Sequence, residues 1–132
     1  LFISPSSIAQ YAALAAFDDD AMAVHEQRRQ IFQRRRDLLA QGLEDLGLEI
    51  PVTPSGAFYL YVDIASTGMD SSEFCWRLID EFKVAVTPGN DFGTVESDRY
   101  VRFAYTTSDE DINLGLERLA RALEQWRSED CS

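Results

Sequence analysis

The stretch Val84-Ala85-Val86-Thr87-Pro88-Gly89, followed after a polar loop by Tyr100-Val101-Arg102-Phe103-Ala104-Tyr105, decides how this chain folds. Its first half is an apolar run that ends in a Pro-Gly turn. Its second half alternates as a strand with two different faces does, because successive strand side chains point to opposite sides. The stretch therefore predicts two strands joined by a loop, with one arginine in the middle of the second strand.

Arg102 is the charged residue of the second strand. Pleating sends Val101, Phe103 and Tyr105 to one face and Arg102 with Ala104 to the other. One interpretation is that Arg102 awaits a carboxylate or phosphate, which its planar guanidinium binds through two hydrogen bonds. The other is a solvent-facing arginine on an edge strand. Spacing alone favours this second interpretation, because charged side chains are mostly exposed.

The composition indicates a globular chain with an acidic surface. The 132 residues suffice for one domain, or for one domain and part of another, and 45% of them are hydrophobic. A formal net charge of −11 disfavours nucleic acid as a partner, because phosphate backbones need a basic surface. No apolar run has the length that a membrane span requires.

Cysteine and histidine give no sign of a metal site. Cys75 and Cys131 are far apart, and His25 is the single histidine, in a polar helical stretch. We therefore expect no metal, and two reduced thiols in a cytoplasmic protein. The chain opens on Leu1-Phe2-Ile3 instead of methionine, which suggests a piece of something longer.

Two helices are expected before residue 48. The first, Ile8 to Phe17, is rich in alanine and has Ser7 as its predicted N-cap, with Gln10 completing a capping box. Its small side chains suit an interface inside a larger molecule. The second runs from Asp18 to Leu46, roughly 40 Å, which suits a bridge between two domains. The aspartates at its start favour the helix electrostatically; they are poor metal ligands because adjacent helix positions diverge.

The rest of the chain alternates strands and helices. Strands are predicted at Leu48–Val52 and Ala57–Ile64, and helices begin after Asp70 and Ser108, with Lys83 ending the first. The predicted buried stripes are Cys75, Leu78, Ile79 and Phe82 on the first of these helices and Ile112, Leu116, Leu119, Leu123 and Trp126 on the second. This order predicts an α/β (α+β) fold. We expect a two-layer small domain, whose short mixed sheet is packed by helices, preceded by a long connecting helix.

Three segments together resemble the C-terminal part of class I/II aminotransferases, the fold-type I enzymes that depend on pyridoxal phosphate. They are residues 53–60 (TPSGAFYL), residues 84–89 with Phe92-Gly93, and residues 100–105 followed by Ser108, Glu110 and Asp111. Residues 3–10 and the alanine-rich helix are similar to the family segment that follows its cofactor-lysine region. The resemblance covers nearly the whole chain, and the order and spacing of the three segments make it specific.

The resemblance implies a domain layout and a substrate site. Residues 1–17 would be the tail end of the large cofactor-binding domain, residues 18–47 the interdomain helix and residues 48–132 the small domain. Arg102 would grip the α-carboxylate of the substrate, and Gly56, in a loop near the substrate, would be a second contact. The substrates would be an amino acid and a 2-oxo acid, with pyridoxal 5'-phosphate as the amino-group carrier and a homodimer as the whole enzyme. No catalytic residue and no cofactor contact is assigned to this chain.

The single lysine, Lys83, departs from the family pattern. In the family the cofactor forms an imine with a lysine of the large domain, which later transfers protons. Lys83 instead precedes Val84, where the family has no catalytic residue. We therefore expect the chain alone to be inactive and to bind no cofactor covalently. Two alternatives stay open: a standalone, non-catalytic binding or interaction module with the same fold, and part of a related pyridoxal-phosphate lyase.

Overall fold

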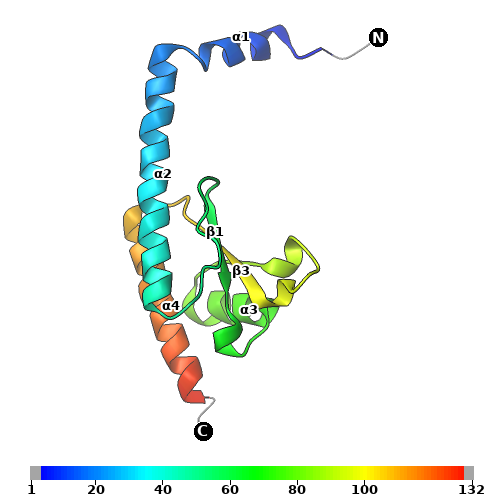
Figure 1. Ribbon diagram of the computed structural model, residues 1–132, viewed down its shortest axis with the longest axis vertical. Helices are drawn as coiled ribbons and strands as arrows, with labels where there is room; N and C mark the ends of the chain where they lie inside the picture. The colour runs from blue at the N-terminus through cyan, green and yellow to red at the C-terminus, as the bar shows by residue number, and fades with distance from the viewer. Residues whose placement is uncertain (1–3, 130–132) are drawn as a thin grey trace. The chain divides into compact units, whose positions relative to one another are not determined.

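The computed structural model describes residues 4–129 (Figure 1). Leu1-Phe2-Ile3 and Cys131 lie outside these described residues. The elements in chain order are α1 Ser7–Ala15, α2 Asp19–Asp45, β1 Tyr59–Asp63, η1 Ala65–Thr67, α3 Ser71–Phe82, β2 Thr87–Pro88, η2 Gly89–Asp91, η3 Ser97–Arg99, β3 Tyr100–Ala104 and α4 Asp109–Glu129, where η marks a short 3-10 helix. Contacts divide the chain into two units, Leu1–Gln33 and Arg34–Ser132. Within residues 4–129, no helix combines the length and the apolar character that crossing a membrane demands.

Helix α1 forms as predicted, but its cap lies one residue earlier. The hydroxyl of Ser6 accepts from the backbone N–H of Ala9 at 3.2 Å, so Ser6 is the N-cap and the prediction of Ser7 was wrong. Ser6 follows Pro5 in an extended conformation, which is the backbone geometry of a cap. Gln10 donates to the carbonyl of Pro5 at 2.9 Å instead of completing a capping box with Ser7. No residue of α1 is buried in the described part of the chain.

Helix α2 confirms the long helix that the sequence predicts. Asp19 and Asp20 lie in its first turn, and Gly47 follows its end with a φ of 81°, a conformation that glycine adopts without strain. Gly42, the one glycine inside the helix, lies against α4. A Cβ at this position would overlap the side chain of Leu116, so the absence of a side chain lets α2 and α4 approach closely.

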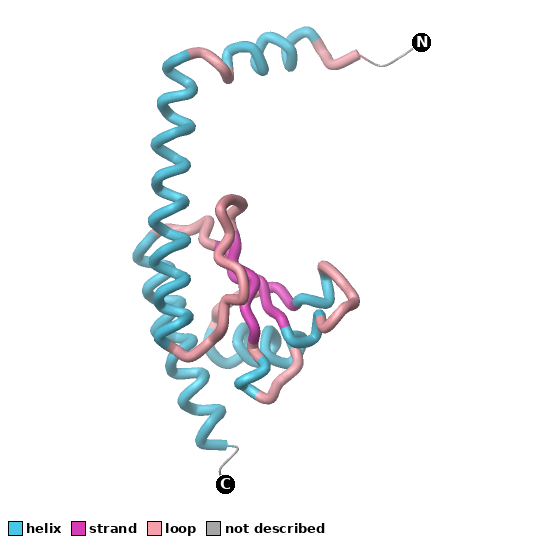
Figure 2. Tube along the Cα trace, in the orientation of Figure 1, coloured by secondary structure: helices cyan, strands magenta, loops and turns pink. Residues whose placement is uncertain are grey.

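The sheet has three strands in the order β1-β3-β2, so the last strand in sequence is the middle one (Figure 2). Tyr61 and Thr87 both register with Arg102, from opposite sides of β3. Both pairings are antiparallel, which corrects the predicted mixed sheet. The crossover from β1 through α3 to β2 leaves those two strands parallel but apart, because β3 inserts between them. The two-layer α/β class itself is confirmed.

Two predicted strands are shorter in the structure or absent from it. At Leu48–Val52, pairing is confined to a single bridge, in which the N–H of Asp63 donates to the carbonyl of Glu49 at 2.9 Å. At Val84–Thr87, only Thr87 belongs to a strand. The N–H of Val84 donates instead to the carbonyl of Leu78, closing the end of α3, so this residue serves the helix and does not pair in the sheet.

The predicted caps of the last two helices are confirmed. Asp70 accepts from the N–H groups of Ser72 and Glu73, both at 2.9 Å, and Lys83 follows α3 in the left-handed conformation. Ser108 accepts from the N–H of Asp111 at 3.1 Å at the start of α4. These bonds satisfy backbone donors that would otherwise lack a partner at a helix end.

The core lies between one face of the sheet and the helices of the second unit. Its fully or nearly buried members include Leu43, Leu60, Val62, Phe74, Leu78, Val101, Phe103, Tyr105, Ile112, Leu119, Leu123 and Trp126. The stripe predicted for α3 is confirmed at Cys75 and Leu78 and needs correction elsewhere. Phe74 is buried, whereas Ile79 is 42% exposed and Phe82 is partly exposed. On α4 the predicted stripe is confirmed except at Leu116, which is only partly buried.

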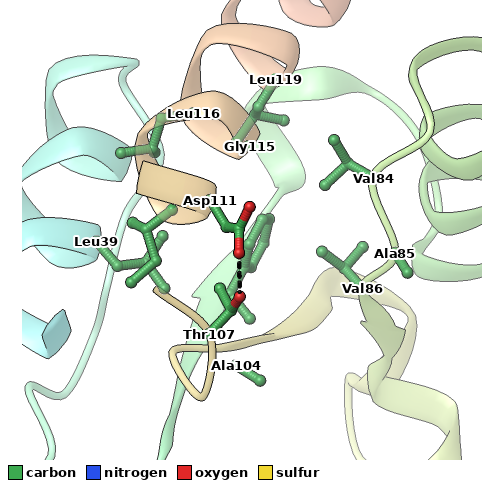
Figure 3. A pocket seen from close by; sticks show the side chains of 12 residues that line it. Leu39, Val84, Ala85, Val86, Ala104, Thr107, Asp111, Gly115, Leu116 and Leu119 are labelled. Atoms are coloured by element: carbon green, nitrogen blue, oxygen red, sulfur yellow. Dashed lines mark hydrogen bonds between the residues drawn. The ribbon is translucent and has the colours of Figure 1, made fainter. Parts of the chain in front are cut away.

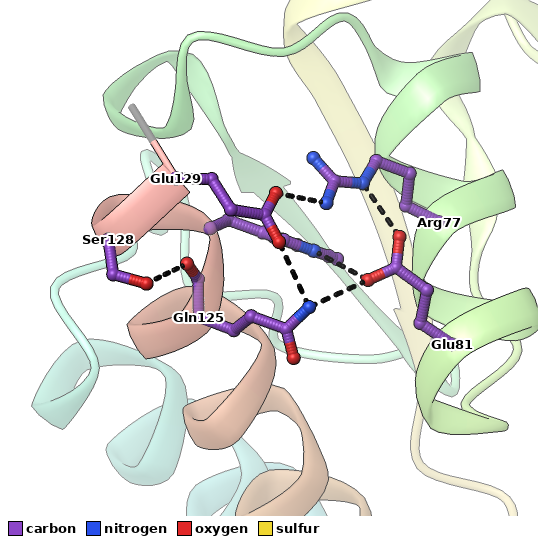
Figure 4. A network of polar contacts seen from close by, with 6 residues as sticks. Arg77, Glu81, Gln125, Ser128 and Glu129 are labelled. Carbon is purple, nitrogen blue, oxygen red and sulfur yellow. Dashed lines mark hydrogen bonds and ion pairs between the residues drawn. The ribbon is translucent and has the colours of Figure 1, made fainter. Parts of the chain in front are cut away.

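A polar network joins α3 to α4 at the edge of this core (Figure 4). Arg77 donates through Nε to Glu81 at 2.8 Å and through Nη2 to Glu129 at 2.7 Å. The indole N–H of Trp126 donates to Glu81 at 3.1 Å, and the Arg77 guanidinium lies over the indole ring. The hydrogen bond from Arg77, together with the bond from Trp126, holds the pKa of Glu81 below its usual value, although burial opposes this.

Gly89, at the junction of β2 and η2, is predicted to be intolerant of a side chain. A Cβ here would overlap the carbonyl oxygen of Ser97 and lie 2.6 Å from that of Tyr100, and backbone atoms cannot move aside cheaply. We expect Gly89→Ala to lower the free energy of unfolding by about 1–3 kcal/mol, measured by urea denaturation. Gly93→Ala in the same loop is the control, because its Cβ would meet nothing within 4 Å. Equal stability of the two variants would contradict the packing described for Gly89.

Candidate functional site

The two faces of the sheet differ in chemistry. Leu60, Val62, Val101 and Phe103 point into the core. The opposite face, which we call the open face, carries Tyr59 and Tyr61 of β1, Thr87 of β2, and Tyr100, Arg102 and Ala104 of β3. The side chains on the open face are partly or fully exposed, so this aromatic surface with one cation is available to a ligand.

Arg102 lies at the centre of the open face. It belongs to the middle strand and is partly buried, so it is not the solvent-facing arginine of an edge strand. Its Cζ lies over two aromatic rings, 4.3 Å from the centroid of Phe92 and 5.4 Å from that of Tyr59. A cation at these distances is attracted by the negative face of an aromatic ring.

The hydrogen-bonding capacity of Arg102 is largely unused. A guanidinium has five N–H donors. Within the described residues, Nη2 donates to Thr87 Oγ1 at 3.5 Å, the outer limit of a hydrogen bond, and the buried Nε has no partner. No Asp or Glu among these residues forms an ion pair with Arg102, whereas Arg36, Arg77 and Arg99 each have at least one acidic partner. Arg102 is therefore a partly desolvated cation, and most of its N–H donors have no protein acceptor among the described residues.

The loop between β2 and β3 supplies Phe92 and is closed by its own contacts. The hydroxyl of Ser97 donates to the side-chain oxygen of Asn90 at 2.6 Å, and the N–H of Phe92 donates to the carbonyl of Gly89 at 2.8 Å. Gly89 is buried where the loop crosses Tyr61, whose hydroxyl would lie 2.5 Å from a Cβ on that glycine. Hydrogen bonds within the loop thus hold the backbone of Phe92, whose ring lies beside Arg102.

An ion pair fastens the other end of this loop to β1. Arg99 donates through Nε to the buried carboxylate of Asp63 at 2.6 Å, and the N–H of Ala65 donates to the same carboxylate at 2.8 Å. The bond from Arg99 holds the pKa of Asp63 below its usual value, although burial opposes this shift. Beside the pair, the rings of Tyr61 and Tyr100 stack at 5.0 Å, and burial raises the pKa of Tyr61. Arg99 thus has an acidic partner and Arg102 does not.

Gly56, the second predicted contact, lies in the loop that leads into β1. Its carbonyl accepts from the hydroxyl of Tyr105 at 3.3 Å, and Ala57 next to it has a φ of 64°. The guanidinium of Arg36 donates to the nearby carbonyl of Pro54 at 2.9 Å. The structure describes no contact between Gly56 and Arg102. Gly56 is exposed before the start of β1, and its role as a substrate contact stays a prediction.

Three residues of the site were missed from the sequence: Tyr59, Thr87 and Phe92. Phe92 was visible only as part of a Phe-Gly pair in a loop, with no signal that its ring reaches Arg102. Tyr59 and Thr87 share the open face through strand register, which depends on how three distant segments pair. That register could not be derived from the alternation of any one strand.

Two other features lie away from Arg102. The hollow shown in Figure 3, about 140 Å³ in volume, opens between the start of α4 and the segment before β2, and neither Arg102 nor Gly56 lines it. Cys75 is buried in α3, where burial, and secondly the charge of Asp91, raises the pKa of its thiol to about 11. That thiol stays protonated near neutral pH, which fits an unreactive core residue.

The sequence is similar to a known family and to known proteins. The family model for aminotransferase class I and II matches residues 1–119. The aspartate/prephenate aminotransferase of Thermus thermophilus is 43% identical over 122 residues, which are 91% of this chain and 30% of that protein. The aromatic-amino-acid aminotransferase 2 of Thermococcus litoralis is 39% identical over 123 residues, 92% of this chain and 31% of that protein. The chain thus spans less than a third of the length of these relatives.

Solved structures give the same result. An aminotransferase from Mycobacterium tuberculosis superimposes with a TM-score of 0.87 at 32% identity, covering 95% of this chain and 32% of that one. The aspartate aminotransferase from Thermus thermophilus with maleate has a TM-score of 0.78 at 43% identity, covering 89% of this chain and 30% of that one.

The Asp63–Arg99 pair predicts a pH dependence of stability. Because the pKa of Asp63 is lowered on folding, the unfolded chain takes up this proton first as the solution is acidified. The stabilisation is therefore complete above about pH 4, the ordinary pKa of aspartate, and is lost as pH falls through the lowered pKa. We expect Asp63→Asn to reduce the acid-induced loss of stability, and to cost about 1 kcal/mol at neutral pH, measured by thermal denaturation.

The control for this experiment is Asp98→Asn, which removes an exposed carboxylate from the same loop. Its acid sensitivity should match that of the unsubstituted chain. If Asp63→Asn lost stability with acid as steeply as the unsubstituted chain, the pair would contribute nothing to the pH dependence.

Proposed function

Because this chain belongs to the aminotransferase class I and II family, as the resemblance of its sequence predicted, we propose that it is the C-terminal part of an amino-acid aminotransferase. The whole enzyme would move an amino group between an amino acid and a 2-oxo acid. The role of this chain would be to hold the substrate by its α-carboxylate, with Arg102 as the residue that binds it.

The observation that carries the proposal is the buried Nε of Arg102, which lacks a hydrogen-bond partner among the described residues. A buried donor without a partner costs free energy, about 1–3 kcal/mol and more for a charged group. A carboxylate would supply acceptors that this cation lacks, because its two oxygens match the fork of a guanidinium. The Thermus enzyme with maleate, a dicarboxylate, supports this choice of ligand.

Carboxylate binding at Arg102 also agrees with the local electrostatics. The buried carboxylate of Asp63 is bound to Arg99, so it does not compete for Arg102. The rings of Tyr59 and Phe92 exclude water from part of the guanidinium, and charge-assisted hydrogen bonds are stronger where water is excluded. The chain is thus equipped to bind and orient a substrate, which is one large component of enzymatic rate acceleration.

We propose that pyridoxal phosphate forms no covalent bond with this chain. The family depends on that cofactor, whose aldehyde combines with amines, but Lys83 is the only lysine here. Lys83 is exposed at the end of α3, where its ammonium donates to the carbonyl of Asp80. We therefore assign no chemical step to this chain, and infer that it is inactive by itself.

The proposed domain layout follows the sequence analysis. Residues 1–17 would end the large domain, residues 18–47 would connect the domains and residues 48–132 would form the small one. The side chains of Ile8, Tyr11 and Leu14 on α1 are largely exposed in the described chain, which supports an interface with the remainder of a larger, homodimeric enzyme.

The substrate side chain is not part of the proposal. Relatives of similar identity have different names, among them an aromatic-amino-acid aminotransferase and a valine–pyruvate aminotransferase. A segment shared by such proteins fits recognition of the α-carboxylate, a group common to amino acids, better than recognition of one side chain.

Replacing Arg102 in the full-length enzyme tests the proposal. We expect Arg102→Gln to lower kcat/KM for the amino-acid substrate by about 30- to 1,000-fold, or about 2–4 kcal/mol, with Arg102→Lys intermediate because lysine keeps the charge and loses the fork. Steady-state kinetics with maleate as a competing carboxylate measures the effect. Arg121→Gln, on the exposed side of α4, is the control for loss of a positive charge. Unchanged kinetics in a folded Arg102→Gln enzyme would rule out the carboxylate clamp.

Reduction of an imine tests the absence of a cofactor site in this chain. The 132-residue chain is mixed with pyridoxal phosphate, treated with borohydride and analysed by peptide mass spectrometry. We expect Lys83 to gain an adduct no more readily than the terminal amino group, because its environment is solvent. Saturable labelling of Lys83, one cofactor per chain, would show that the chain has a cofactor site of its own.

A further inference from the structure

We infer that Phe92 is a positioning residue for Arg102, and that its ring fixes the guanidinium before the substrate carboxylate arrives. This inference rests on the proposed function, because it concerns the same site. It assigns a role to a half-exposed loop residue that, in the proposal, does not touch the substrate itself.

The ring of Phe92 is placed beside Arg102. Phe92 is 52% exposed, so hydrophobic burial does not account for a large aromatic side chain at this position. The ring contacts Arg102, whose Cζ lies 4.3 Å from the ring centroid. This is closer than the 5.4 Å that separates the same atom from the ring of Tyr59. Phe92 is therefore the nearer of the two rings that hold the cation.

The loop backbone that carries the ring is held by its own contacts. The N–H of Phe92 donates to the carbonyl of Gly89, and Gly89 is buried against the backbone of Ser97 and Tyr100. The bond between Ser97 and Asn90 closes the loop from the other side. The backbone that carries the ring is thus held by contacts that do not involve Arg102.

Hydrogen bonds restrain Arg102 only weakly. Its hydrogen bond to Thr87 is 3.5 Å long, and Nε has no partner among the described residues. An arginine side chain has several rotatable bonds, and immobilising it when a ligand binds costs affinity. The two rings impose part of that order in advance. Because the rings attract the cation without taking up its N–H donors in conventional hydrogen bonds, those donors stay available to a carboxylate.

Substitution of Phe92 in the full-length enzyme tests this role. We expect Phe92→Leu, which keeps an apolar side chain and removes the ring, to raise KM for the amino-acid substrate about three- to tenfold, with kcat changed less than twofold. Phe92→Tyr, which keeps the ring, should restore KM to within about twofold of the unsubstituted value. Val95→Ala, at an exposed position of the same loop, is the matched control and should leave both constants unchanged.

A double substitution separates positioning from a general effect on the loop. If Phe92 acts through Arg102, Phe92→Leu should have no further effect in an Arg102→Gln enzyme, because the group that it positions is gone. A purely structural role would instead lower the melting temperature and give independent effects in the double variant. Independent effects, or an unchanged KM in Phe92→Leu while Arg102→Gln is impaired, would overturn this inference alone. An unimpaired Arg102→Gln enzyme would overturn the proposed function.

Discussion

A cation that has no acidic partner within residues 4–129, held on the middle strand of a small sheet, is the constraint on which the rest of this structure depends. Arg102 lies between β1 and β2, so its backbone is fixed from both sides while its side chain is only partly in contact with water. Aromatic rings stabilise the charge without neutralising it. A carboxylate of the protein itself would stabilise it more strongly, and would also block the site. The chain retains an unsatisfied donor where an ion pair was chemically possible.

The topology explains how the remaining parts serve that residue. Because the last strand in sequence becomes the middle one, segments from three parts of the chain meet at Arg102: Tyr59 from β1, Thr87 from β2 and Phe92 from the following loop. The ion pair between Asp63 and Arg99 then ties the end of that loop to the far end of β1. Arg99 and Arg102, three residues apart, thus differ. Arg99 is paired with Asp63 and has a structural role, whereas Arg102 has no acidic partner among the described residues.

The sequence predicted the fold class because its strongest signals are local. The helices were found from their caps and apolar spacing, as Asp70 and Gly47 illustrate, and β1 and β3 from their aromatic and β-branched content. The errors arose where a tertiary contact overrides a local preference. Val84 has strand character, yet its N–H closes α3, and Ile79 fits a helical stripe that α4 does not cover. The order of the strands depends on long-range pairing, which alternation within one strand cannot specify.

The candidate site divides in the same way. Arg102 stood out in the sequence as one charge in an apolar strand, and family resemblance gave it a predicted role. Its surroundings could not be derived, because the ring of Phe92 reaches it through a loop whose shape is set by the close packing of Gly89. That arrangement has a chemical logic. A carboxylate binds two coplanar N–H donors, so the protein gains most by restraining the guanidinium with groups that do not occupy those donors. Aromatic rings meet that requirement, since they attract the cation without accepting a conventional hydrogen bond. A hydrogen-bonding neighbour would occupy the donors that the ligand needs, which accounts for an arginine held mainly by rings.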